Sequence, residues 1–109
     1  MASNNDKVPE LTNGEFEEFI KKGVVLVDFF AEWCMPCVMM APVIEDLSET
    51  FKGKIKFAKV NVGDAPEIAE KFDVSSIPNL IVFKDGKVVS RMIGAQSADD
   101  LEDKLREFL

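Results

Sequence analysis

The chain has 109 residues, of which 47% are hydrophobic and nine are phenylalanines, so it can bury one core without disulfide support. A formal net charge of -7, with lysines scattered along the sequence, argues against a surface for nucleic acids or anionic membranes. No apolar run has the length of a membrane span or the setting of a signal peptide. We therefore expect a soluble, cytoplasmic, monomeric protein, with a disordered tail at residues 1–6 and one domain over residues 7–109.

Helix and strand signals alternate in the first half of the chain. Residues 12–15 have the spacing of a capping box, and the apolar residues that follow keep helical spacing up to Gly23. Residues 24–30 are a nearly continuous apolar run, as expected of a strand that is covered on both faces. Residues 34–51 have helical spacing again, although Pro42 should kink that helix because it removes a backbone donor.

A second strand and a short helix come next. Residues 55–62 have the composition of a strand. Asp64 is predicted to cap a short helix, because a carboxylate can accept from the first backbone N–H groups. Pro66 fits the first turn of that helix, where its missing N–H does no harm.

The last third of the chain predicts a hairpin and a final helix. Residues 79–83 and 88–93 are strand-like and flank a turn at residues 84–87, which indicates an antiparallel hairpin. Ser97 is predicted to cap the last helix. Four apolar residues of that helix are expected on one face: Leu101, Leu105, Phe108 and Leu109. The order of elements implies a mixed sheet between layers of helices.

The only two cysteines, Cys34 and Cys37, lie at the start of the second predicted helix and follow the first strand directly. A helix N-terminus favours a thiolate at the first sulfur, because unpaired N–H groups and the helix dipole point at it. The second sulfur lies about one turn further along the same face. Such a pair supplies the attacking and the resolving thiol that thiol–disulfide exchange needs.

Two other interpretations of the pair are weaker. Half of a zinc site has the same spacing, but the chain has no histidine and no second cysteine pair to complete the usual ligand set. A purely structural disulfide over so short a loop would stabilise the fold little, and no secretion signal accompanies it. We therefore expect redox chemistry, with no metal and no bound cofactor beyond the cysteine pair itself.

Asp28 is a carboxylate inside the apolar run of residues 24–30. It either faces outward from an edge strand, which is the commoner situation, or is buried in a central strand. In the second case desolvation would raise its pKa and keep part of it protonated near neutral pH.

Several short motifs, taken together, resemble the sequence pattern of one protein family. They are Val27-Asp28-Phe29, Ala31-Glu32-Trp33-Cys34, Pro36-Cys37, Ala41-Pro42, Lys59 with Asn61, Ile77-Pro78, residues 84–87 and Gly94. On these motifs the chain resembles the thioredoxins over essentially its whole length. The resemblance implies the thioredoxin fold, an α/β architecture in which a central mixed β-sheet is flanked by helices on both faces.

The resemblance also implies an activity and partners. It points to a protein-disulfide reductase, an electron carrier in cell redox homeostasis that is kept reduced by thioredoxin reductase or an equivalent donor. Its substrates would be protein disulfides. Two alternatives stay open at this point: a dithiol oxidant or isomerase, and a non-catalytic thioredoxin-fold subunit with a binding or chaperone role.

Four residues are the expected catalytic set. Cys34 would attack the substrate disulfide, and Cys37 would then attack Cys34 to free the reduced substrate. The family pattern assigns Asp28 as the acid that deprotonates Cys37. Lys59 lies near that acid in the family and would temper its raised pKa; a solvated lysine is an equally good interpretation.

Six further residues are expected to bind substrate around the cysteines: Trp33, Met35, Pro36, Ile77, Pro78 and Gly94. A tryptophan is more often a core residue, but the position of Trp33 beside the nucleophile favours an exposed wall. Base rates alone favour a trans bond before Pro78, whereas the resemblance implies a cis bond beside the disulfide. Gly94 would give the facing loop room or unusual backbone angles.

Four positions depart from the usual family pattern. Met35 stands where glycine is usual, and Val38 stands where a basic residue normally follows the second cysteine. Phe30 replaces a common tryptophan, and Asn79 replaces the usual threonine. The first two changes make the rim of the predicted site more apolar and remove a nearby positive charge, so they bear on redox potential and partner choice.

Overall fold

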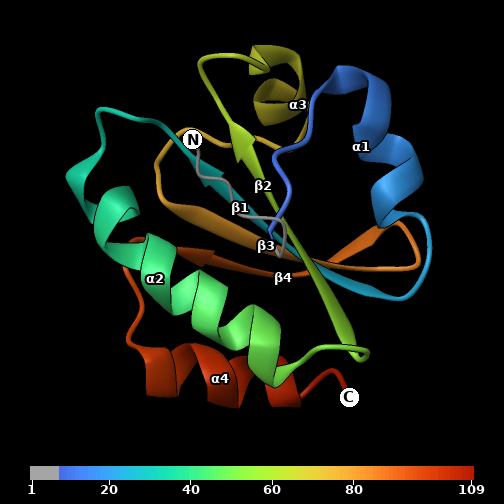
Figure 1. Cartoon of the computed structure of the whole chain (residues 1–109). Helices are drawn as coiled ribbons and strands as arrows, with labels where there is room; N and C mark the ends of the chain where they lie inside the picture. The colour runs from blue at the N-terminus through green and yellow to red at the C-terminus, as the bar shows by residue number, and fades with distance from the viewer. Residues whose placement is uncertain (1–7) are drawn as a thin grey trace.

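A computed structural model describes residues 8–109, and its central feature is a mixed four-stranded sheet with helices on both faces (Figure 1). In chain order the elements are α1 (Asn13–Ile20), β1 (Val24–Phe30), α2 (Met35–Thr50), β2 (Ile55–Asn61), α3 (Pro66–Lys71), β3 (Asn79–Lys84), β4 (Lys87–Ile93) and α4 (Ala98–Arg106). This architecture confirms the predicted fold class. The tail predicted at residues 1–6 lies outside the described residues.

Strand β1 lies inside the sheet, whose order is β2-β1-β3-β4. It runs parallel to β2 and antiparallel to β3, and β4 completes the sheet antiparallel to β3. The five central residues of β1 are buried, as the continuous apolar run predicts for a strand covered on both faces. In this register Asp28 lies between Lys59 of β2 and Leu80 of β3.

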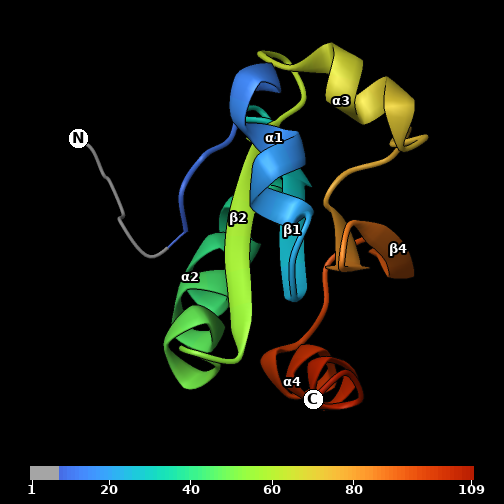
Figure 2. The ribbon, with the colours of Figure 1, turned by 90° about the vertical axis from the view of Figure 1, so that its right-hand side faces the viewer.

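The side chains of β1 alternate between two hydrophobic clusters. Leu26 packs with residues of α2 and α4 on one face, whereas Val25 and Val27 pack with residues of α1 and α3 on the other. Figure 2 shows α1 and α3 together at one side of the strands and α4 at the opposite side. Because Asp28 is two residues from Leu26, it shares the face that α2 covers.

The helix starts follow the predicted caps in two cases. Glu15 accepts from the backbone N–H of Thr12 at 3.0 Å, as the capping-box spacing predicts. Ser97 Oγ accepts from the backbone N–H of Asp100 at 3.1 Å at the start of α4. Helix α2 continues past Pro42 to Thr50.

Three boundary predictions were wrong. Asp64 does not cap α3: the N-cap is Ala65, without a side-chain cap, and Asp64 lies in the preceding turn, where both residues donate their backbone N–H groups to the Asn61 oxygen. Strand β2 ends at Asn61, one residue before the predicted end. Leu109 lies beyond the end of α4 and is exposed, because the helix stops at Arg106.

The hairpin turn is tighter than predicted. Lys84 pairs with Lys87, so the loop has two residues, Asp85 and Gly86, both with positive φ. That conformation suits the right-handed twist of a hairpin, and the Asp-Gly pair adopts it readily. Asp85 also accepts from the backbone N–H of Gly23 at 2.8 Å, which fastens the turn to the start of β1.

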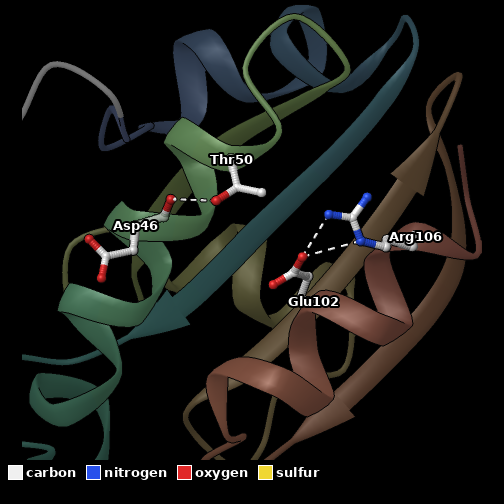
Figure 3. A network of polar contacts seen from close by, with 4 residues as sticks. All are labelled: Asp46, Thr50, Glu102 and Arg106. Atoms are coloured by element: carbon white, nitrogen blue, oxygen red, sulfur yellow. Dashed lines mark hydrogen bonds and ion pairs between the residues drawn. The ribbon is translucent and has the colours of Figure 1, made fainter.

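The outer surfaces of α2 and α4 carry exposed polar contacts (Figure 3). Arg106 donates twice to Glu102 one turn earlier in α4, with the Nη2 contact at 2.6 Å. On α2 the Thr50 hydroxyl donates to the backbone oxygen of Asp46. Exposed pairs of this kind contribute little to stability, typically below about 1 kcal/mol.

Candidate active site

A disulfide joins Cys34 and Cys37 at the start of α2. Cys34 is the N-cap of this helix, and its sulfur accepts from the backbone N–H of Cys37 at 3.3 Å. The Cα atoms of the two residues are 5.3 Å apart, and both residues are buried. A thiolate at the Cys34 position would therefore be stabilised by a helix N-terminus, as the sequence predicts.

The residues around the disulfide are exposed although most are apolar. Trp33 is 80% exposed and Met35 is 66% exposed, so Trp33 is not a core residue. Val38 and Met39 in the next turn of α2 are 52% and 69% exposed. Pro36 lies in the first turn of the helix and is exposed as well. We call Trp33, Met35, Val38 and Met39 the apolar rim.

The loop before β3 closes the other side of the disulfide. The Ile77-Pro78 bond is cis, as the resemblance implies. Ile77 is half-buried and packs against the cluster of buried residues that contains the two cysteines. Gly94 donates its N–H to the Pro78 oxygen at 2.8 Å.

Gly94 is required for its backbone angles and not for space. Its φ is +91°, which L side chains rarely adopt, whereas a Cβ built at this position would meet no atom within 4 Å. Of the two reasons that the sequence left open, the structure supports the conformational one.

Asp28 is buried, with 5% of its surface exposed, so the central-strand interpretation is confirmed. Its Oδ1 atom has no hydrogen-bond partner in the part of the chain that the structure describes. Desolvation raises the pKa of Asp28 to about 7, while the charge of Lys59 acts in the opposite direction. The carboxyl group is therefore poised to gain or lose a proton near neutral pH.

Lys59 is half-buried beside Asp28 on the neighbouring strand. Its backbone is held by the N-terminal segment, because its N–H donates to Pro9 and its oxygen accepts from Leu11. Its ammonium lies 5.7 Å from the centre of the Phe30 ring. No carboxylate within residues 8–109 forms an ion pair with it, so its effect on Asp28 acts through space. Of the two interpretations offered by the sequence, the structure supports the one in which Lys59 lies near the acid and tempers its raised pKa.

A cavity of about 260 Å³ is lined by both Asp28 and Cys37. Its lining consists of Asp28, Phe30, Ala31, Glu32, Cys37, Val38, Ala41 and Lys59. Four of these residues are aliphatic or aromatic, and three are charged: Asp28, Glu32 and Lys59. Asp28 and Cys37 therefore line the same small cavity.

Metal and membrane sites have no support in the described residues. Within residues 8–109 there is no group of three or more cysteine, aspartate or glutamate residues arranged to hold a metal ion. In the same range no helix combines the length and the apolar character needed to cross a membrane.

The structure brings the predicted site residues together in two groups. Trp33, Met35 and Pro36 flank the disulfide at the start of α2, while Ile77 packs against it from the loop before β3, next to Pro78. Asp28 of β1 and Lys59 of β2 form the second group, and both line the cavity that Cys37 also lines. Sequence reasoning missed Arg91, a half-buried arginine on β4 whose acceptors come from distant parts of the chain. No sequence motif marks it.

Comparisons with known proteins agree with this geometry. A sequence model described as Thioredoxin matches residues 7–107. A protein named thioredoxin from Staphylococcus haemolyticus is 45% identical over 102 residues, which cover 94% of this chain and 98% of that protein. The chain belongs to the thioredoxin family. Thioredoxins of Staphylococcus saprophyticus and Staphylococcus aureus are 43% and 42% identical, with the same coverage.

Family membership and a Cys-x-x-Cys disulfide together support protein-disulfide reduction, so the predicted activity is confirmed. The chain is a thiol–disulfide oxidoreductase of the thioredoxin family, with a redox-active disulfide as its reacting group. Thioredoxins work with a reductase that supplies electrons and with disulfide substrates, and both kinds of partner apply to this chain.

Proposed function

We propose that Cys34 is the nucleophile and Cys37 the resolving thiol of this reductase. The Cys34 thiolate attacks one sulfur of a substrate disulfide, so a Cys34–substrate bond forms and the other substrate sulfur leaves as a thiolate that takes up a proton. Deprotonated Cys37 then attacks Cys34, which releases the second substrate thiol and leaves the Cys34–Cys37 disulfide. Two electrons pass to the substrate. The N-cap position of Cys34 carries this assignment.

We infer that Asp28 accepts the proton of Cys37. Support comes from its raised pKa of about 7, its unpaired oxygen and the cavity that it shares with Cys37. A general base works best when its pKa lies near the working pH. Lys59 is proposed to keep that pKa from rising further, because its charge favours the ionised acid.

Substrate binding is proposed for six residues around the disulfide: Trp33, Met35, Pro36, Ile77, Pro78 and Gly94. The exposed apolar side chains would contact the substrate, since burying them removes apolar area from water. The backbone near Ile77 and Pro78 would pair with an extended substrate segment as a short added strand.

Three further properties are proposed beyond family membership: the electron donor, the oligomeric state and the cellular compartment. The electron donor is a flavoprotein thioredoxin reductase or its equivalent, and the chain acts as a monomer. The cytoplasm is the proposed compartment, because a dithiol reductase works where thiols are kept reduced. Cell fractionation and light scattering would test the last two points.

The cysteine roles are tested by trapping. We expect Cys37→Ser to accumulate a covalent adduct with insulin through Cys34, because the resolving attack is lost. Cys34→Ser should form none and should lose reductase activity. Mass spectrometry of non-reduced mixtures measures the adduct, with the double variant as a blank. Equal trapping by both single variants, or trapping only through Cys37, would contradict the assignment.

A further inference from the structure

A hydrogen-bonded bridge connects β4 to the loop that joins α3 to β3, residues 72–78. The guanidinium of Arg91 donates from Nη2 to the Phe72 carbonyl oxygen at 2.7 Å and from Nη1 to Asn79 Oδ1 at 3.4 Å. Asn79 Nδ2 donates in turn to the carbonyl oxygen of Ser76 at 3.2 Å. These contacts tie the beginning and the end of the loop to one side chain.

The strand register explains how Arg91 reaches both ends. Arg91 pairs with Ile81 and Asn79 pairs with Ile93, so Arg91 and Asn79 are diagonal neighbours on one face of the sheet. Phe72 is the C-cap of α3, where the carbonyl oxygens of a helix end attract a cation. The short bond to Phe72 is the principal anchor, and the longer one to Asn79 is weaker.

The acceptors of Arg91 are neutral oxygens. Among the described residues it forms no ion pair with a carboxylate, and it is half-buried. Asn79 is 1% exposed, so water is poorly placed to replace a lost partner there. Without the guanidinium, the loop would lose this side-chain tie to β4, and the Asn79 side chain would keep only its contact with Ser76.

The bridged loop carries the part of the site that faces the substrate. Ile77 lies between the two tied points and packs against the cluster that contains Cys34 and Cys37. The next residue, Pro78, accepts from Gly94 at its oxygen. A shift of the loop would therefore move the proposed docking surface relative to the reactive sulfurs, without changing the sulfurs themselves.

We propose that Arg91 is a positioning residue for protein substrates. It touches neither the disulfide nor the proposed docking surface; through Phe72 and Asn79 it holds Ile77 and Pro78 in the place where an extended substrate pairs. This inference rests on the proposed function of that loop. Its consequence is selective: loss of Arg91 weakens the capture of protein disulfides and spares exchange with small disulfides, which need no docking surface.

Stopped-flow measurements with the fully reduced protein test this proposal. For Arg91→Met we expect the second-order rate constant for insulin reduction to fall about five- to tenfold. In a steady-state assay, in which a reductase regenerates the dithiol, the KM for insulin should rise while kcat stays similar, because docking and not chemistry is impaired. The rate with oxidised glutathione should stay within about twofold. Arg91→Lys should recover part of the insulin rate, since an ammonium still donates to the Phe72 oxygen.

The control variant is Arg106→Met, which makes the same chemical change in an exposed pair on α4 (Figure 3). It should leave both rates unchanged. If Arg91→Met fails to fold, Asn79→Thr is compared in its place, because this substitution removes the amide that binds Ser76. We then expect a loss of about two- to threefold in the rate with insulin and none with oxidised glutathione.

The outcomes separate the two levels of inference. An insulin rate that does not change in the Arg91 or Asn79 variant, or a loss that is equal for insulin and glutathione, overturns the positioning role and leaves the reductase assignment standing. If the unmodified protein itself fails to reduce insulin, the proposed function fails and the positioning role fails with it.

Discussion

Replacing Asp28 with asparagine should make the protein more stable at alkaline pH. The acid is buried, its Oδ1 has no partner among the described residues, and its pKa is raised to about 7 from the usual 3.8. An acid with a raised pKa in the folded state binds more protons there than in the unfolded state. The part of the free energy of unfolding that depends on protonated Asp28 is therefore fully present below about pH 4 and is lost as the pH rises to about 7.

The size of the effect follows from that window. Each pH unit is worth about 1.4 kcal/mol, so roughly three units give an upper bound of about 4 kcal/mol for the destabilisation by ionised Asp28. A buried asparagine amide without a full set of partners removes about 1–2 kcal/mol of the gain. We expect Asp28→Asn to raise the free energy of unfolding by about 2–3 kcal/mol at pH 8 and to lower it by about 1–2 kcal/mol at pH 4, where only the cost of the amide remains.

Urea unfolding of the oxidised protein between pH 4 and pH 9 measures this difference. Asp46→Asn is the matched control, because it removes an exposed carboxylate from the surface of α2 and should leave the pH dependence of stability unchanged. A gain that is equal at pH 4 and pH 8 would show that the effect is one of packing and not of ionisation. A loss of stability at pH 8 would refute the reasoning altogether.

The same variant should also slow resolution of the mixed disulfide, because an amide cannot accept the Cys37 proton. Rapid quenching of the reaction with insulin gives that rate. An unchanged rate would remove Asp28 from the mechanism and leave it as a structural acid.

Three further predictions concern the surroundings of the disulfide. Lys59→Met should shift the pH dependence of resolution and of stability to higher pH, because the charge that lowers the pKa of Asp28 is gone; an unchanged or lowered profile would contradict this. Val38→Lys should increase the thiolate fraction of Cys34 modestly, since an exposed cation is screened, and thiolate absorbance during a pH titration measures it; a decrease would refute the electrostatic reasoning. Met35→Gly should slow reduction of insulin more than reduction of oxidised glutathione, because it removes an exposed contact surface; equal slowing would rule that role out.

The sequence predicted the elements whose causes are local. The apolar run of β1, the Ser97 cap and the Asp-Gly turn each depend on residues close together in the chain, and the structure contains all three. The Asp64 cap failed for a local reason as well. Asp64 and Ala65 both donate their backbone N–H groups to the Asn61 oxygen, and this turn places Asp64 one residue before the N-cap, Ala65.

Features that depend on contacts between distant parts of the chain were harder to predict from the sequence. The burial of Asp28 follows from the place of β1 inside the sheet, which no pattern within β1 itself determines. The cis bond before Pro78 came from family resemblance, because local preference favours the other form. Arg91 binds the end of α3 and the start of β3, and no spacing in the sequence connects those three points.

The two cysteines of the disulfide are buried, whereas the residues beside them are exposed. Cys34 and Cys37 are 5% and 3% exposed, whereas Trp33 beside them is 80% exposed. Because the sulfurs are buried and the rim is exposed, we expect a partner to contact tryptophan and methionine side chains before it reaches a sulfur atom. An uncharged substitution on the rim, such as Met35→Gly, should therefore change the choice of partner more than the chemistry of the buried pair, whereas a charged one, such as Val38→Lys, should act on both.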